Sequence, residues 1–272
     1  MATTMRLVSF NILEGLRPVD PLAGERRLID RDRAAAVTRV VADLRPDIMV
    51  VNEALHCRFY AGRKVDYADL LGFQHHVSAL YDGAWGNAIL SRFPISNSNE
   101  MRIYNRGGLS AFIETPMGDV TIASYHPHPR RYPENKAQDF VNLLSSVRGP
   151  LIVCGDFNCI SPQDEIDRDC LIEACSAFSA DPKATVDQFL KSGQMVFGSL
   201  AGLGLTDAIP PAGRRYSIPT DLLRKDKASG MRIDHVLANQ LIEIVEGEVV
   251  HSEASNKASD HHPVTITFRI RR

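Results

Sequence analysis

Short apolar runs flank a stretch with helical spacing over the first fifty residues of the chain. Residues 6–12 and 47–52 contain the mostly apolar runs 7–10 and 48–51, which are typical of buried strands. Between them, residues 31–44 carry apolar side chains every three or four positions, and Pro46 follows at the point where such a helix ends. The pattern therefore predicts a strand, a helix and a second strand.

Similar patterns continue to the end of the chain and indicate one large α/β domain. Short strands and hairpins mixed with helices favour a single domain, residues 1–272, with two sheets and helices outside them. The further elements that we expect are a strand over 86–95 ended by Phe93-Pro94, paired strands over 110–115 and 119–125, helices over 135–147 and 183–192, a loop-rich segment over 206–232, and strands over 233–238 and 264–270.

Polar residues of the catalytic or metal-binding type stand at the ends of several predicted strands. After the apolar residues 151–153 come Asp156 and Asn158, and alternation along an extended segment predicts that their side chains share one face. Each such residue alone has an ordinary explanation as a turn or surface residue. Their repetition at strand ends indicates one site, and its further members are Asn11, Glu53, His126, Asp234, Asp260 and His261.

This residue set is suited to hydrolysis of a phosphate ester. Carboxylates without cysteine ligands favour Mg²⁺, or Mn²⁺, over zinc. An imidazole paired with a carboxylate provides a positioned, charged donor for a phosphoryl oxygen. Asp156 beside Asn158 is able to activate and orient a water molecule, so the chemistry that we expect is metal-assisted hydrolysis.

Composition narrows the class of protein. The chain has 44% hydrophobic and 24% charged residues, as in ordinary globular proteins. No apolar run approaches the roughly 20 residues of a membrane helix, and the N-terminus lacks a signal-peptide pattern, so we expect no membrane anchor and a cytoplasmic location. The five cysteines are expected to be reduced. A net charge of −2 disfavours an enzyme that binds long duplex DNA through its phosphates. Nothing in the sequence indicates an obligate protein partner.

In these motifs the chain closely resembles the endonuclease/exonuclease/phosphatase superfamily, which has the deoxyribonuclease I-like fold. The resemblance implies an α/β (α+β) fold, a four-layer sandwich of two packed mixed sheets flanked by helices. Any one motif is weak, whereas all of them in the family's order are a strong signal. The matching segments are residues 9–11, 51–53, 86–95, 124–126, 155–158, 232–235 and 259–264.

The resemblance implies a metal side and a water-activating side of the site. On the metal side it places Glu53 as the principal Mg²⁺ ligand, with Asn11 beside it and Asp260 as a further carboxylate. It implies that Asp156 activates or positions the attacking water. Asn158 is expected to orient the substrate phosphate.

The same resemblance implies two phosphate-contacting histidines. His261 is expected to contact the scissile phosphate with Asp234 as its buried partner, and His126 is expected to be the second such histidine. Asn87 is a candidate for substrate contact. Arg92 is expected to be structural.

Two departures from the family pattern bear on these expectations. Asn52 stands where many members have glutamine, a conservative change that leaves Glu53 as the expected ligand. Residues 126–132 replace the usual continuation after the first histidine and lack the pattern of abasic-site endonucleases, which disfavours DNA repair.

The substrate is left open between a nucleic acid and a small organophosphate. Two alternatives also stay open. One is a lipid phosphodiesterase at a membrane surface, similar to sphingomyelinases, for which Phe59-Tyr60 and residues 81–85 are the candidate apolar loops. The other is a catalytically inert binding module, which we expect to have lost Glu53, Asp156 or His261, and all three are present.

Overall fold

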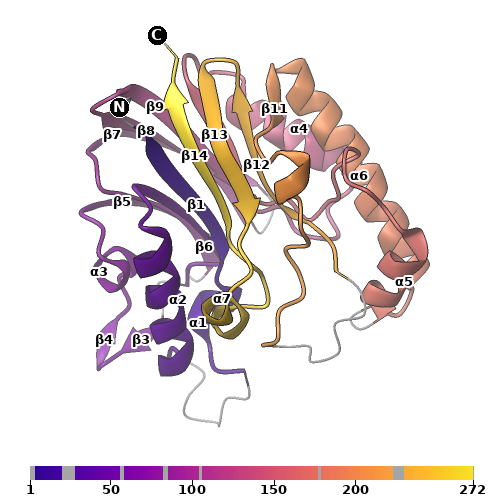
Figure 1. The fold of residues 1–272 in the computed structure, drawn as a ribbon, viewed down its shortest axis with the longest axis horizontal. Coiled ribbons are helices and arrows are strands. Elements are labelled where there is room, and N and C mark those ends of the chain that lie inside the picture. Colours follow the sequence, from indigo (N-terminus) through magenta and orange to yellow (C-terminus); the bar gives the residue numbers. More distant parts are fainter. Residues whose placement is uncertain are drawn as a thin grey trace.

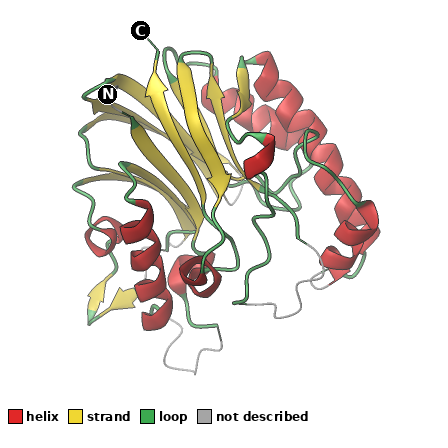
Figure 2. Ribbon diagram, in the orientation of Figure 1, coloured by secondary structure: helices red, strands yellow, loops and turns green. Residues whose placement is uncertain are grey.

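Two six-stranded mixed sheets lie face to face, with helices against their outer faces (Figures 1 and 2). The computed structural model describes residues 4–19, 28–55, 58–81, 85–103, 106–176, 179–222 and 230–271. This arrangement confirms the expected sandwich of two packed sheets flanked by helices.

The first sheet contains both strands of the predicted N-terminal unit. β1 and β2 pair in parallel, which is possible because a helix connects them, and the other neighbours in this sheet are antiparallel. Its strands, in spatial order, are β13 (Ile242–Val249), β14 (Val264–Ile270), β1 (Met5–Asn11), β2 (Ile48–Asn52), β6 (Trp85–Ser91) and β5 (His75–Tyr81).

The second sheet is built around β10, the strand that ends in Asp156. β10 pairs in parallel with β9 and antiparallel with β12. A separate small ribbon pairs β3 (Phe59–Tyr60) with β4 (Arg63–Lys64). The strands of the second sheet, in order, are β11 (Leu205–Asp207), β12 (Asp234–Asn239), β10 (Leu151–Asp156), β9 (Gly118–Tyr125), β8 (Arg106–Thr115) and β7 (Ile95–Ile103).

The helices divide between the two outer faces. One apolar cluster joins the first sheet to α2 and α3, and another joins the second sheet to α4 and α6. None of the helices in the described residues is both long and apolar enough to cross a membrane. The helices are α1 (Leu13–Leu16), α2 (Arg31–Leu44), α3 (Tyr67–Leu71), α4 (Pro133–Leu144), α5 (Arg168–Ser176), α6 (Pro182–Gly202) and α7 (Glu253–Ala258), with a short 3-10 turn η1 (Pro211–Gly213).

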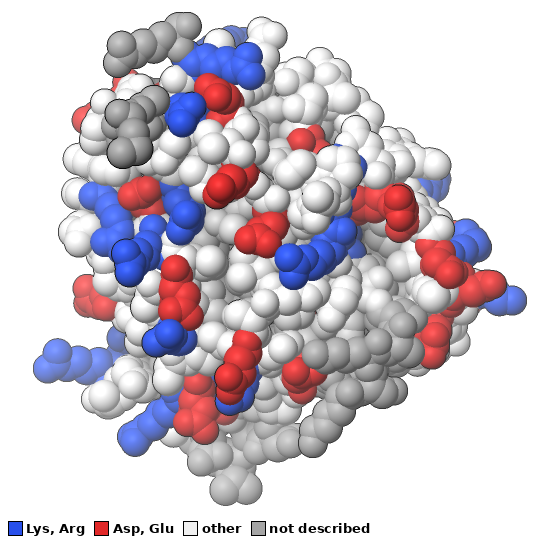
Figure 3. Space-filling model, in the orientation of Figure 1, with Lys and Arg blue, Asp and Glu red and all other residues white. Residues whose placement is uncertain are grey.

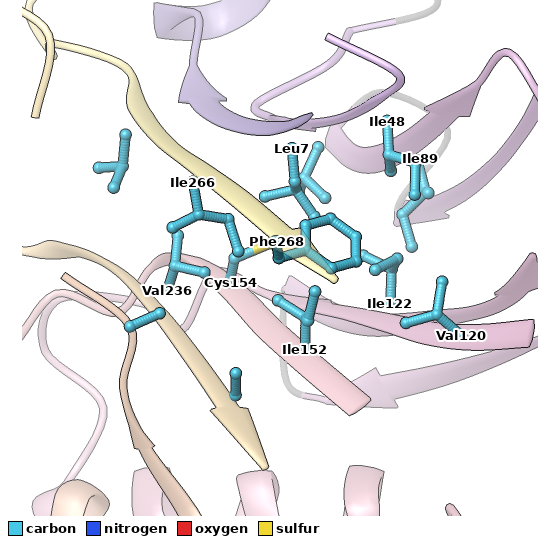
Figure 4. Packing of buried hydrophobic residues seen from close by; sticks show 14 of the residues in the cluster. Leu7, Ile48, Ile89, Val120, Ile122, Ile152, Cys154, Val236, Ile266 and Phe268 are labelled. Atoms are coloured by element: carbon cyan, nitrogen blue, oxygen red, sulfur yellow. The ribbon is translucent and has the colours of Figure 1, made fainter. Parts of the chain in front are cut away.

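The central core lies between the sheets and explains why β10 begins as an apolar run. In β10, Ile152 and Cys154 point into this core, where Figure 4 shows them near Leu7 and Ile266 of the facing sheet. Val153 points the opposite way and packs against the helices of the second sheet. Since both faces of the strand are covered, each position is buried, and the run shows no polar alternation.

Helix α2 has the boundaries that the sequence predicts. Asp30 caps its N-terminus by accepting hydrogen bonds from the backbone N–H groups of Asp32 and Arg33. At the other end, Arg45 adopts a left-handed conformation, and Pro46 follows. The two predicted strands on either side are present as β1 and β2.

Several predicted elements have different boundaries. The helix over 135–147 is observed as α4 and ends at Leu144, and the strand over 110–115 is observed as β8 and begins at Arg106. The strand over 86–95 is wrong at its end, because β6 stops at Ser91, whose hydroxyl accepts a hydrogen bond from the Phe93 N–H, and a new strand starts at Ile95. The helix over 183–192 is too short, because α6 continues through Gly193 to Gly202. At Gly193 the helix lies against the Ile160 carbonyl, and only a residue without a side chain leaves room for this contact.

Candidate active site

The polar strand ends predicted from the sequence meet at one end of the two sheets. Asn11 pairs with Asn52 across β1 and β2, and Asp156 pairs with Asp234 across β10 and β12. In Figure 1 this is the end at which β1 leads into α1. Because the sheets face each other, the two pairs approach across the sandwich, and the Asn11 Nδ2 atom lies 3.1 Å from Asp156 Oδ2.

Asp156 is the buried centre of this group. Its Oδ1 accepts a hydrogen bond from the Asn158 N–H at 2.9 Å, and its Oδ2 faces Asn11 and two histidines. The Nε2 atoms of His126 and His261 lie 3.3 and 3.8 Å from Oδ2. Burial opposes ionisation of Asp156, but the charge and the hydrogen bond of His126 lower the pKa of its carboxyl group below the usual value. The carboxylate therefore stays charged at neutral pH.

His261 is held by a buried carboxylate. Its Nδ1 donates to Asp234 Oδ2 at 2.7 Å, and the Asp234 N–H donates to the Ser217 hydroxyl oxygen. Burial disfavours a charge on the ring, but Asp234, followed by Asp260, raises the pKa of His261 well above that of a free histidine. The ring is thus an imidazolium at neutral pH, with Nε2–H directed towards the Asp156 side.

Glu53 leaves β2 in an unusual backbone conformation. Its φ is 59°, in the left-handed region that non-glycine residues seldom adopt and that is often found at functional sites. Its Oε2 accepts from the Glu14 N–H at 2.6 Å, and its Oε1 lies 3.4 Å from Asn11 Nδ2 and 3.9 Å from His126 Nε2. Burial raises the pKa of this carboxyl group despite the nearby His126. A bound cation would relieve that cost.

The site has the donors that a hard divalent cation requires. Asp156, Asp234 and His261 each offer one ligand atom, and these atoms lie within 4.8 Å of one another. In this set, however, the imidazole already bonds to Asp234 and carries a proton, which makes it a poor ligand. Glu53 and Asp260 stay the predicted ligands, because both offer oxygen donors, and the charge of Asp260 helps to raise the pKa of Glu53.

Asn11 does not offer its oxygen to this centre. Its Oδ1 accepts from the Leu13 N–H at 3.0 Å, and its Nδ2 is directed at Glu53 and Asp156. In this arrangement Asn11 links and orients the two carboxylates.

The shared face predicted for Asp156 and Asn158 is wrong. β10 ends at Asp156, and Asn158 has a φ of 48°, so the chain has already turned out of the extended conformation that alternation assumes. The Asn158 side chain donates to the Pro127 carbonyl at 3.0 Å, which ties the turn to the loop after His126. Asn158 therefore belongs to the site, but its side chain is oriented by a turn.

Two other residues expected near the site make protein contacts. Asn87 is buried, its Oδ1 accepts from Asn52 Nδ2 at 2.8 Å and its Nδ2 donates to the Gly107 carbonyl. Its predicted contact with substrate stays a prediction. Arg92 donates to the Pro46 carbonyl and lies over the ring of Phe73, in keeping with a structural residue.

Asn52 has a larger part in the site than its position before Glu53 indicates. Its Nδ2 donates to Asn87 and to the Ser124 hydroxyl, and its Oδ1 accepts from the Asp156 N–H at 2.9 Å. One buried amide thus connects the two sheets and holds the backbone of Asp156. The only signal in the sequence was a polar residue within an apolar strand end.

Arg33 is a second residue that the sequence did not reveal. This buried arginine of α2 donates to four backbone carbonyls, and the charges of Asp260 and Glu53 act on it. It looks like any other charged helix residue in the sequence, because its acceptors are distant in the chain. The acceptors are the carbonyl oxygens of Ile12, Leu13, Arg17 and Ala258.

A sequence profile of the Endonuclease/Exonuclease/phosphatase family matches residues 8–261. The chain belongs to this family. The match spans every strand end that contributes to the site, from Asn11 to His261, and confirms the resemblance seen in the motifs. The family includes hydrolases that act on phosphoester bonds.

Solved structures share the fold of this family member at low sequence identity. An endonuclease/exonuclease/phosphatase protein from Beutenbergia cavernae superposes with a TM-score of 0.72 at 21% identity, over 98% of this chain and 72% of that one. The 3′ phosphatase NExo from Neisseria, solved with a product DNA hairpin, gives 0.63 at 19%, over 96% and 98%. The human Nocturnin catalytic domain, with a bound sulfate, gives 0.60 at 19%, over 98% and 94%. Comparison with curated protein sequences finds no match.

Proposed function

We propose that this protein is a metal-dependent hydrolase that cleaves a phosphate ester through a water molecule oriented by Asp156. The observation that carries the proposal is the position of Asp156 Oδ2, which faces two imidazole Nε2 atoms at 3.3 and 3.8 Å. An ionised carboxylate opposite imidazole donors is the arrangement that holds a water against an anionic phosphoryl group.

In the proposed reaction the residues have complementary tasks. Asp156 accepts a hydrogen bond from the attacking water and takes up its proton as the new P–O bond forms and the P–O bond to the leaving oxygen breaks. His261 and His126 donate through Nε2–H to phosphoryl oxygens, where negative charge increases in the transition state. Asp234 keeps the His261 ring charged and oriented through the 2.7 Å hydrogen bond.

Glu53 and Asp260 are the residues that would hold Mg²⁺ or Mn²⁺. When bound, such an ion polarises a phosphoryl oxygen and offsets the charge of the leaving oxygen. Asn11 keeps Glu53 and Asp156 in their relative positions through its two donor contacts.

The proposed substrate is a phosphate ester in a nucleic acid or in a small organophosphate. Related folds include a phosphatase solved with product DNA, which supports a nucleic acid. Figure 3 shows acidic and basic side chains interspersed on the displayed face, and that face offers no broad basic surface for a long duplex. Together with the net charge of −2, this favours a short strand or a small phosphodiester.

The test is Mg²⁺-dependent hydrolysis of bis-p-nitrophenyl phosphate, with single- and double-stranded DNA, RNA and inositol phosphates in parallel. We expect His261→Ala and Asp156→Ala to lower kcat about a hundredfold or more on each substrate that the wild type cleaves. His76→Ala and Asp43→Ala make the same changes at exposed positions on β5 and α2 and are the matched controls. Near-wild-type turnover in either site variant would contradict the assignment of Asp156 and His261 as catalytic residues.

The same panel, extended by sphingomyelin vesicles, separates the two alternatives. An inert binding module would show no hydrolysis of any ester. A lipid phosphodiesterase would cleave sphingomyelin in vesicles and leave the nucleic acids intact. Of its candidate apolar residues, Tyr60 is 39% exposed, and residues 82–84 lie outside the described residues.

A further inference from the structure

Lys136 is a fully buried lysine that no motif of the site includes. It lies on α4 with no solvent exposure, and its Nζ donates to the Asn158 carbonyl oxygen at 2.8 Å. Among the ion pairs of the described residues, none involves Lys136. Burial lowers the pKa of its ammonium group, while Asp156 acts in the opposite direction. A lysine buried at such a cost, with a backbone carbonyl as its partner, calls for an explanation.

The carbonyl that Lys136 holds belongs to the turn directly after Asp156. Asn158 adopts a φ of 48°, a left-handed conformation that asparagine visits more readily than most residues with a side chain. Its N–H donates to Asp156 Oδ1 at 2.9 Å. The next carbonyl, that of Cys159, is bonded at 2.9 Å by Nε2 of the buried His235. Two buried basic side chains therefore hold consecutive carbonyl groups of one turn.

The two backbone hydrogen bonds of Asn158 restrain its two backbone torsions. Asp156 Oδ1 holds the peptide N–H on one side of its Cα, and Lys136 Nζ holds the carbonyl on the other. If the carbonyl were released, the left-handed conformation would lose a stabilising contact, and the N–H would move away from Oδ1. The Asp156 carboxylate would then lose the contact at Oδ1, and only Asn11 and the histidines would restrain it through Oδ2.

We propose that Lys136 is a positioning residue that holds the Asn158 turn and, through it, the carboxylate of Asp156. The inference rests on the function proposed for Asp156. An opposing explanation is that Lys136 only fills space beside the apolar residues of α4, such as Ala137 and Phe140. Methionine matches the shape of the lysine stem without the donor, so it separates the two explanations.

The first measurement is amide hydrogen exchange of Asn158, followed by NMR, and it needs no activity. In Lys136→Met we expect the Asn158 N–H to exchange at least about tenfold faster, while the Val153 N–H in β10 keeps its protection. The matched control is Lys191→Met, which removes a lysine that pairs with Glu134 on the exposed side of α4 and α6. Unchanged exchange of Asn158 in Lys136→Met would overturn the proposal.

The second measurement is a double-mutant cycle in kcat. Lys136→Met alone is expected to lower kcat about tenfold to a hundredfold, with KM and the Kd for Mg²⁺ changed by less than about threefold. In an Asp156→Asn background the same substitution is expected to have an effect of less than about threefold, because Lys136 acts through Asp156. Equal losses in both backgrounds would show a general structural effect.

Two further outcomes are distinguishable. If Lys136→Met does not fold, Lys136→Arg keeps a donor and a charge, and we expect it to retain Asn158 protection. Loss of that protection in a folded Lys136→Arg variant would contradict the proposal. If the wild type hydrolyses no phosphate ester, the proposed function fails, and the exchange result still decides whether Lys136 holds the turn.

Discussion

His261 Nδ1 lies 2.7 Å from Asp234 Oδ2, and both groups are buried. The two residues come from different places, because Asp234 begins β12 whereas His261 lies in the loop between α7 and β14. The pair orients the ring so that Nε2 faces Asp156, and it keeps the ring charged. The role proposed for His261 thus depends on a contact between distant segments.

Replacing Asp234 with asparagine is expected to remove that charge. A neutral amide cannot stabilise an imidazolium as a carboxylate does, so the pKa of His261 falls. If the reaction needs the protonated ring, kcat/KM drops about tenfold to a hundredfold. The alkaline limb of the pH–rate profile also moves to lower pH, because the ring loses its proton at a lower pH. The measurements are a pH–rate profile on bis-p-nitrophenyl phosphate and an NMR titration of the His261 ring. A profile with an unshifted alkaline limb would contradict the role of Asp234.

Replacing Glu53 with glutamine is expected to separate stability from metal binding. Because burial raises the pKa of Glu53, the metal-free protein has to bear the cost of a buried carboxylate. The variant should therefore unfold at the same temperature as metal-free wild type, or a higher one. Wild type should gain about 2.7 kcal/mol of stability at Mg²⁺ a hundredfold above its Kd and lose it on addition of EDTA, whereas the variant should not respond. Thermal unfolding with and without Mg²⁺ checks this, and a full Mg²⁺ response in the variant would exclude Glu53 as a principal ligand.

Gly155 is expected to tolerate no side chain. Its φ is 143°, and a Cβ atom would lie 2.7 Å from the Tyr125 carbonyl oxygen and 3.1 Å from Asn52 Oδ1. Gly155→Ala should cost about 1–3 kcal/mol of unfolding free energy and displace Asp156. Gly198→Ala is the control, because that helical glycine has open space around it and alanine should stabilise α6 by about 0.5–1 kcal/mol. Urea denaturation of both variants gives the comparison, and equal stabilities would refute the steric argument.

His235 is expected to make stability depend on pH. Burial, followed by the charge of Arg232, lowers its pKa from 6.5 to about 4 in the folded protein. Between these values the unfolded chain binds a proton that the folded chain does not, so stability falls as pH decreases from 6.5 to about 4. The loss is about 3 kcal/mol for this group.

The check is urea denaturation at several pH values between about 7 and about 4, with His235→Gln beside the wild type. Glutamine keeps a donor for the Cys159 carbonyl and does not titrate, so the variant should lose less stability over this range. A parallel loss in both proteins would show that His235 is not the titrating group.

Local patterns were sufficient for much of the fold. The helix over residues 31–44 has a capping aspartate at one end and a proline beyond the other, and both signals are short-range. The strand ending in Asp156 was recognisable because it is apolar on both faces. Edge strands were missed, since β7 is mostly exposed and polar and its partner in β8 is set by tertiary pairing.

The sequence by itself determined which residues are available for the site, because motif order and residue chemistry are properties of the chain. Glu53, Asp156 and His261 could be named from their strand ends and their neighbours. Only the tertiary structure decided how they are held. Asn158 turns out of the strand, Asn52 joins the two sheets, and Lys136 reaches the carbonyl after Asp156. Each of these contacts joins groups that are distant in the chain or depends on a left-handed torsion, and neither leaves a periodic signal in the order of residues.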